Sequence, residues 1–158
     1  MAVLKNFDSP SALLQNGQSR ELLALNPVLQ ENGLALTPED AEEILSARDL
    51  TLKNLGRIEL DTQVTQEILR RLSSSPYITQ TNLVNSVCEL YETFQFIRGE
   101  VPEDISDENI LDSVASCFEN ICHGSLALTA GKGAEKIIRQ LRGEPDEDEA
   151  ETDGEEED

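Results

Sequence analysis

The sequence predicts an all-α protein, a single compact bundle of five to six helices followed by a disordered acidic tail. Two patterns indicate this fold class. Apolar residues recur every three or four positions in several segments, and capping residues, glycines or prolines stand at the ends of those segments. No pair of alternating, β-branched segments predicts a sheet. We therefore divide the chain into a loosely ordered N-terminal arm (1–18), a helical domain (19–142) and the tail (143–158).

The first two helices are predicted from the residues at their ends. Ser19 is the expected N-cap of the first helix, which Pro27 breaks or kinks. The second helix has the clearest start in the chain, because Thr37 is suited to the N-cap and Pro38 to the first helical position. Gly56 is expected to end this helix.

A short link and two further helices follow. Residues 57–60 alternate polar and apolar side chains and are expected to be extended; Asp61 or Thr62 then caps a third helix, which stops at residues 73–76. The fourth helix, residues 79–98, is the best core candidate because it carries a continuous apolar stripe. The stripe consists of Leu83, Val87, Leu90, Tyr91 and Phe94.

Two helices complete the predicted domain. Ser106 is the expected N-cap of the fifth helix, Phe118 lies on its apolar side, and Gly124 ends it. The last helix is expected at residues 134–142. Phe118 and the stripe of the fourth helix are therefore the predicted centre of the core.

The charge of the chain is strongly negative, and much of the excess lies in the tail. The 12 Lys and Arg residues stand against 32 Asp and Glu residues, which gives a formal net charge of -20. Residues 144–158 contain 11 of the acids and no basic residue. Such a surface repels phosphate and anionic lipid, so we expect neither nucleic acid nor a membrane as partner. Three cysteines and the lack of an apolar leader favour a reducing cytoplasm.

Three motifs together resemble a known family. They are Gly56-Arg57-Ile58-Glu59, Ser75-Pro76-Tyr77-Ile78 with Gln80, and Ser106-Asp107 followed by Phe118 and Cys122-His123-Gly124-Ser125-Leu126. In this order they resemble an uncharacterised family of small cytoplasmic proteins of Firmicutes-type bacteria, a domain of unknown function. The resemblance implies a helical bacterial protein and transfers no functional residue. The chain departs from the family at Arg98-Gly99-Glu100 and in its acidic tail.

The cysteines and the single histidine are the first candidates for chemistry. Cys117, Cys122 and His123 form a Cys-x4-Cys-His pattern. Zinc needs four ligands, and residues five apart on an α-helix point about 140° from each other. We therefore expect core cysteines, a histidine near the helix end, no metal and no cofactor. A Cys–His nucleophile is disfavoured for a similar reason, because adjacent helical residues diverge.

A second group of candidates surrounds the third helix. Arginine forms planar bidentate pairs with carboxylates and other anions. Arg57, Glu59, Arg71 and Tyr77 are accordingly the candidate ligand-binding residues, with Arg70 beside them. Ordinary surface ion pairs explain the same residues. No catalytic residue is predicted.

The function that we expect from these patterns is protein–protein interaction, as an adaptor, a regulator or an accessory subunit, with another protein as partner. One alternative is a small-ligand binder or enzyme whose site uses the Arg/Glu/Tyr group. Another is mimicry of nucleic acid by the acidic surface. A pocket with convergent Arg and Tyr groups would favour the ligand binder, and an exposed apolar patch would favour the interaction module.

Overall fold

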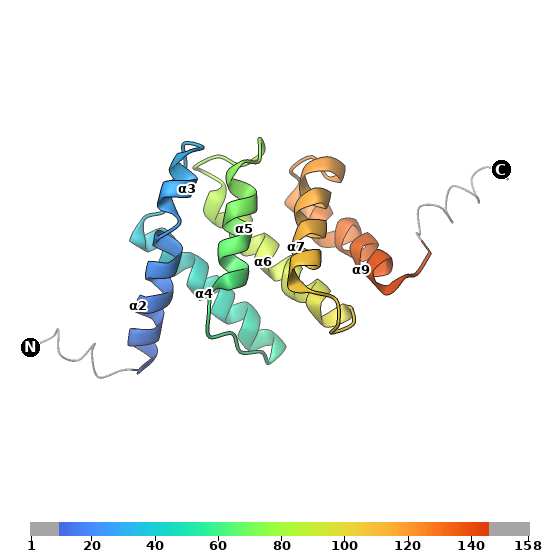
Figure 1. Ribbon diagram of the computed structural model, residues 1–158, viewed down its shortest axis with the longest axis horizontal. Coiled ribbons are helices and arrows are strands. Elements are labelled where there is room, and N and C mark those ends of the chain that lie inside the picture. Colours follow the sequence, from blue (N-terminus) through green and yellow to red (C-terminus); the bar gives the residue numbers. More distant parts are fainter. Residues whose placement is uncertain (1–9, 146–158) are drawn as a thin grey trace, which may run out of the picture. The chain divides into compact units, whose positions relative to one another are not determined.

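The computed structural model of the protein describes residues 10–145, and these form helices joined by short links (Figure 1). No strand occurs in this part of the chain, so the predicted all-α class is confirmed. The elements are α2 (Pro10–Leu23), α3 (Asn26–Gln30), α4 (Pro38–Leu55), α5 (Gln63–Ser73), α6 (Leu83–Glu100), α7 (Asp107–Ser116), the π-helical segment η1 (Cys117–Ile121), α8 (Leu126–Leu128), a second π-helical segment η2 (Thr129–Gly133), and α9 (Ala134–Arg142).

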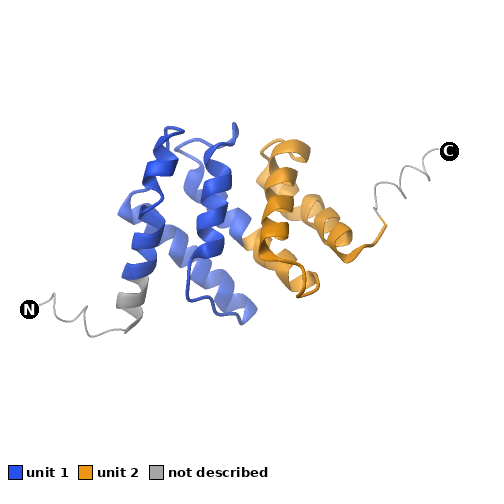
Figure 2. Ribbon diagram, in the orientation of Figure 1, with its two compact units in different colours: residues 1–91 blue, residues 92–158 orange. Residues whose placement is uncertain are grey.

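The chain divides into two compact units, residues 1–91 and residues 92–158 (Figure 2). In the first unit, α2 packs against α4 and α5, and α3 packs against α5. In the second unit, α7 packs against α9 and the two π-helical segments contact each other. The division between the two units falls inside α6. Because the apolar stripe of this helix continues past the division, apolar periodicity in the sequence does not reveal where one unit ends and the other begins.

The first helix begins earlier than predicted. α2 starts at Pro10, so residues 10–18 are helical rather than part of a loose arm, and Ser19 is not an N-cap. Gly17 lies inside this helix, where a glycine costs about 1 kcal/mol relative to alanine. Packing of the buried Leu22 side chain against the rest of the unit offsets that cost. The remainder of the predicted arm and residues 146–158 of the predicted tail lie outside the described residues.

The predicted ends of α4 and the start of α7 are confirmed. Thr37 and Asp40 form a capping box, in which the Thr37 hydroxyl accepts from the Asp40 amide at 3.1 Å and the Asp40 carboxylate accepts from the Thr37 amide at 2.9 Å. Gly56 follows α4 with a φ of 67°, a conformation that favours glycine. The Ser106 hydroxyl accepts from the Asn109 amide at 3.1 Å at the start of α7.

α6 is shifted along the chain from its predicted position. Thr79 was the expected start, but its side chain caps a turn together with Asn82: the Asn82 amide donates to the Thr79 hydroxyl at 3.3 Å, and the Thr79 amide donates to Asn82 Oδ1 at 2.8 Å. The helix begins after this turn, at Leu83. At its other end it continues past the predicted last residue, 98, to Glu100.

The end of the fifth predicted helix is π-helical. In η1 the Cys122 amide donates to the Cys117 carbonyl, five residues earlier, at 2.8 Å. His123 and Gly124 then both adopt positive φ, 49° and 84°. His123 was expected in the last helical turn, near the negative end of the helix dipole; it lies instead in the left-handed residue pair that ends the helix. The Gly124 amide closes this end by donating to the Phe118 carbonyl at 2.8 Å.

Candidate functional site

Arg48 is the only charged residue that is buried among the side chains that the structure describes, with 2% of its surface exposed. Its place in α4 explains the burial. It stands four residues after Ile44 and four before Leu52, on the helix face that also buries Ala41 and Leu45. A guanidinium group held there must find partners inside the unit, because an unpaired buried charge costs several kcal/mol.

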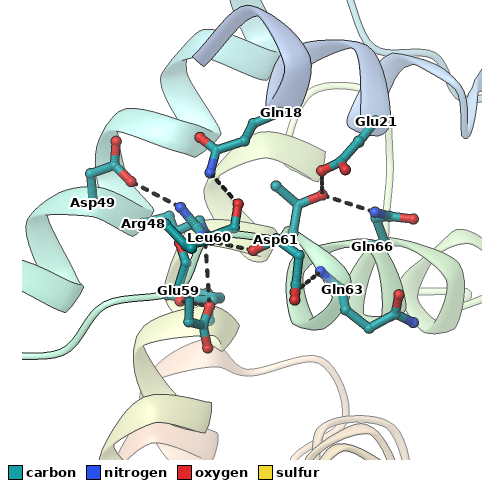
Figure 3. A network of polar contacts seen from close by, with 11 residues as sticks. Gln18, Glu21, Arg48, Asp49, Glu59, Leu60, Asp61, Gln63 and Gln66 are labelled. Carbon is teal, nitrogen blue, oxygen red and sulfur yellow. Dashed lines mark hydrogen bonds and ion pairs between the residues drawn. The ribbon is translucent and has the colours of Figure 1, made fainter. Parts of the chain in front are cut away.

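Two residues of the link between α4 and α5, together with the neighbouring Asp49 on α4, are the partners of Arg48 (Figure 3). Its Nη2 donates to the backbone carbonyls of Glu59 and Asp61, both at 2.6 Å. Its Nη1 donates to the Asp49 carboxylate at 3.0 Å, and the Glu59 carboxylate lies 3.7 Å from Nη2. Its Nε is buried and makes no hydrogen bond. The planar, charged fork of arginine thus holds two carbonyls of one loop at once.

The Glu59 carboxylate is held by a second element as well. The Tyr91 hydroxyl, on α6, donates to Glu59 Oε1 at 2.6 Å. Tyr91 is itself 2% exposed, so its ring is packed in the core of the first unit while its hydroxyl reaches the link. Arg48 and Tyr91 therefore hold Glu59 from α4 and from α6, at its backbone and at its side chain.

Two contacts from α2 complete the network around the link. Gln18 Nε2 donates to the Leu60 carbonyl at 2.9 Å, as Figure 3 shows. The buried Thr62 hydroxyl donates to the Glu21 carboxylate at 2.6 Å and accepts from Gln66 Nε2 at 2.8 Å. Because these side chains come from α2 and α5, the link is fastened to several helices of the first unit. We give the name Arg48 network to Arg48 and the side chains bonded around this link, which are Gln18, Glu21, Glu59, Thr62, Gln66 and Tyr91.

The link is held firmly and yet exposes large apolar side chains. The backbone carbonyls of residues 59–61 all accept hydrogen bonds from side chains. On the same stretch Ile58 is 86% exposed and Leu60 is 69% exposed. Leu50 and Leu55 on α4 are exposed as well. Four of the nine exposed large hydrophobic residues in the described part of the chain thus fall between residues 50 and 60.

The four candidate ligand-binding residues occupy three places in the first unit. Glu59 belongs to the Arg48 network. Arg57 is half-buried in the same link, where its amide donates to the Leu52 carbonyl at 2.8 Å. Arg71 is on α5 and pairs with the Glu67 carboxylate at 2.9 Å. Tyr77 lies in the link between α5 and α6 with 37% of its surface exposed.

Sequence reasoning missed Arg48 and the polar role of Tyr91. The signal for Arg48 was present, since an arginine stands on the apolar stripe of an otherwise regular amphipathic helix. A charged residue at such a position predicts a buried polar network. Nothing comparable marks Tyr91. A buried tyrosine hydroxyl usually finds a hydrogen-bond partner, but the sequence does not show which residue supplies it.

Cys117 and Cys122 are brought together, contrary to expectation. Their sulfur atoms lie 3.7 Å apart, and both residues are buried free thiols, as expected for core cysteines. The 140° separation holds only for an α-helix; in a π-helical turn, residues five apart stand nearly above each other. Burial raises the pKa of Cys117 to about 12, and the contact with Cys122 adds to the rise. No three His, Cys, Asp or Glu side chains among the described residues gather closely enough to hold a metal ion.

The cysteine pair packs on Gly133 of η2. A methyl group at Gly133 would lie 2.8 Å from Cys117 Sγ and 3.0 Å from the Leu128 carbonyl. We expect Gly133→Ala to lower the free energy of unfolding by about 1–2 kcal/mol, because the strain of overpacking exceeds the gain in helix propensity. Urea unfolding followed by circular dichroism measures this loss. In a Cys117→Ala background, Gly133→Ala should lower the free energy of unfolding by less. An equal loss in both backgrounds would contradict the contact between residue 133 and Cys117.

In the described residues, these features define an all-α protein that contains a buried polar network and a buried pair of thiols. The chain belongs to a family of unknown function (DUF6323), and the match covers residues 21–147. The predicted membership of an uncharacterised family is therefore confirmed. No match was found among curated proteins or among solved structures. No helix in the described part of the chain combines the length and the apolar character needed to cross a membrane.

Proposed function

We propose that this protein is a protein–protein interaction module, acting as an adaptor, a regulator or an accessory subunit, and that residues 57–60 are its docking element. The observation that supports the proposal is the exposure of Ile58 and Leu60 on a backbone that the Arg48 network holds in place. We also propose, from the sequence resemblance and the free cysteines, that the protein works in the cytoplasm of a bacterium.

A fixed loop suits docking for an energetic reason. Burying an exposed Leu or Ile side chain contributes about 1.5–3 kcal/mol. A flexible loop loses much of that gain when it becomes ordered on binding. Three consecutive carbonyls of this link are already held by hydrogen bonds. Ile58 and Leu60 can therefore enter a partner's cleft with little further ordering of the backbone.

The partner that fits is a protein with an apolar cleft and basic residues at its rim. The chain has a net charge of -20, and exposed carboxylates of Asp49 and Asp61 flank the docking element. Complementary charge steers association and weakens as salt is added. We favour this role over the alternative of a small-ligand binder or enzyme using Arg57, Glu59, Arg71 and Tyr77, because Glu59 already holds Arg48 and Tyr91.

The test is partner capture from the host with two matched double variants. Ile58→Ser/Leu60→Ser removes the docking element. Ile121→Ser/Leu128→Ser makes the same chemical change at two other exposed positions, which are 53% and 52% exposed. We expect the first variant to reduce recovery of a specific partner about tenfold or more, corresponding to roughly 1.4 kcal/mol at least, and the second to leave recovery unchanged.

The captured partner is then purified, and its affinity for the wild-type protein and for both variants is measured by calorimetry at low and at high salt. Thermal unfolding of each variant establishes that it is folded. Equal affinity of the partner for the wild-type protein and for Ile58→Ser/Leu60→Ser would contradict the docking element. Loss of binding in both double variants would show that binding depends on exposed apolar surface in general and not on the docking element.

A further inference from the structure

Cys117 and Cys122 form a pair of buried free thiols in the second unit. The two sulfur atoms are 3.7 Å apart, and the residues are 2% and 6% exposed. The pair depends on η1, because the hydrogen bond from the Cys122 amide to the Cys117 carbonyl places residues five apart on one side of the helix. A regular α-helix with the same sequence would separate the two side chains.

We propose that Cys117 and Cys122 are an intramolecular thiol–disulfide couple, oxidised by a small peroxide such as hydrogen peroxide. The sulfur atoms of a disulfide are about 2.05 Å apart, so they must approach by about 1.6 Å from their present distance. Rotation about the Cα–Cβ bonds of two neighbouring side chains supplies movement of that size. The two sulfur atoms are already adjacent, so no other element has to move out of the space between them.

The reaction starts at Cys122, the more exposed of the two. Its thiolate attacks one oxygen of hydrogen peroxide, the O–O bond breaks, and Cys122 becomes a sulfenic acid as hydroxide leaves and takes up a proton to form water. The Cys117 sulfur then attacks the Cys122 sulfur, forming the S–S bond and releasing a second water molecule, which carries the Cys117 proton. Two thiols and one peroxide thus give one disulfide and two water molecules, with sulfur oxidised and peroxide oxygen reduced.

The order of attack follows from burial. Cys117 lies deeper than Cys122, with 2% against 6% of the residue exposed, so peroxide reaches Cys122 first. A small oxidant is required, because a bulky disulfide such as oxidised glutathione has little access to a sulfur in a residue that is 6% exposed. Cys88 is half-buried in the first unit, and burial raises its pKa to about 11, so it is expected to react slowly.

The test treats the full-length chain with hydrogen peroxide at neutral pH, under conditions where circular dichroism stays native. We expect the mass to fall by two hydrogen atoms, peptide mapping to locate a Cys117–Cys122 bond, and dithiothreitol to restore all three thiols. Cys88→Ser, the matched control, should form the same bond at the same rate. Cys117→Ser should accumulate a sulfenic acid at Cys122 that dimedone captures, because the second thiol that would convert it to a disulfide is gone.

Three results would overturn the couple. One is a native, peroxide-treated protein that retains three free thiols. Another is a disulfide that contains Cys88, and the third is a Cys122 that passes to sulfinic acid with no bond to Cys117. The mapping of the wild-type protein needs no substitution, so it decides the matter even if a cysteine variant fails to fold.

Discussion

Arg48→Met is expected to lower the free energy of unfolding of the first unit by about 3–5 kcal/mol. The substitution keeps the apolar stem of the side chain and removes the guanidinium group. The carbonyls of Glu59 and Asp61 then lose the charged donor that they share, and a hydrogen bond to a charged group contributes about 1.5–3 kcal/mol. The Glu59 carboxylate also loses a positive charge 3.7 Å away.

Urea unfolding followed by tyrosine fluorescence measures this effect, because both tyrosines of the chain, Tyr77 and Tyr91, belong to the first unit. The matched control is Arg70→Met on α5. Arg70 pairs with Glu67 at 3.1 Å, but its side chain is 49% exposed, so its loss should cost less than about 1 kcal/mol. Arg48→Lys should recover only part of the stability, since an ammonium group lacks the planar fork. Similar midpoints for Arg48→Met and Arg70→Met would show that the buried network contributes little.

Phe94→Ala is expected to cost about 3–5 kcal/mol, whereas Phe96→Ala should cost less than about 1 kcal/mol. The two residues stand two positions apart on α6, in the second unit, and undergo the same chemical change. Phe94 is 1% exposed, so truncation leaves a cavity in the core; Phe96 is 49% exposed, and water fills the space. Phe118, also 1% exposed, is another aromatic residue of the predicted core.

Circular dichroism through a urea titration measures both losses on the protein with its two units intact. A fall in the unfolding midpoint is expected for Phe94→Ala and hardly any change for Phe96→Ala. Equal midpoints for the two variants would mean that the burial of Phe94 does not determine the stability of this unit, and the predicted core stripe of α6 would then be wrong.

Local hydrogen bonds explain why several helix ends were predictable from the sequence. The capping box of Thr37 and the cap of Ser106 each involve residues three positions apart, so the pattern and the contact are both local. Gly56 is similar, because the left-handed conformation after α4 favours glycine whatever packs nearby. The buried aromatic residues of the fourth predicted helix follow from apolar spacing alone.

The candidate site was predictable only in part. Glu59 was predicted as a candidate ligand-binding residue because it stands in a cluster of Arg, Glu and Tyr residues around the third helix, and the structure places it in the Arg48 network. Its partners were not predictable, because Arg48 and Tyr91 lie 11 and 32 residues away in the chain. Only the packing of α4 and α6 around the link decides which polar groups are near enough to bond. The exposure of Ile58 and Leu60 follows from the same packing.

The sequence by itself determined that this protein is helical, acidic and built on apolar stripes, and it determined where several helices begin and end. Tertiary structure decided the early start of α2, the later start of α6 and the π-helical turn that joins Cys117 to Cys122. The physical reason is the range of the interactions. Caps and apolar periodicity act within about one or two helical turns, whereas the length of a helix and the twist of its last turn depend on what packs against it.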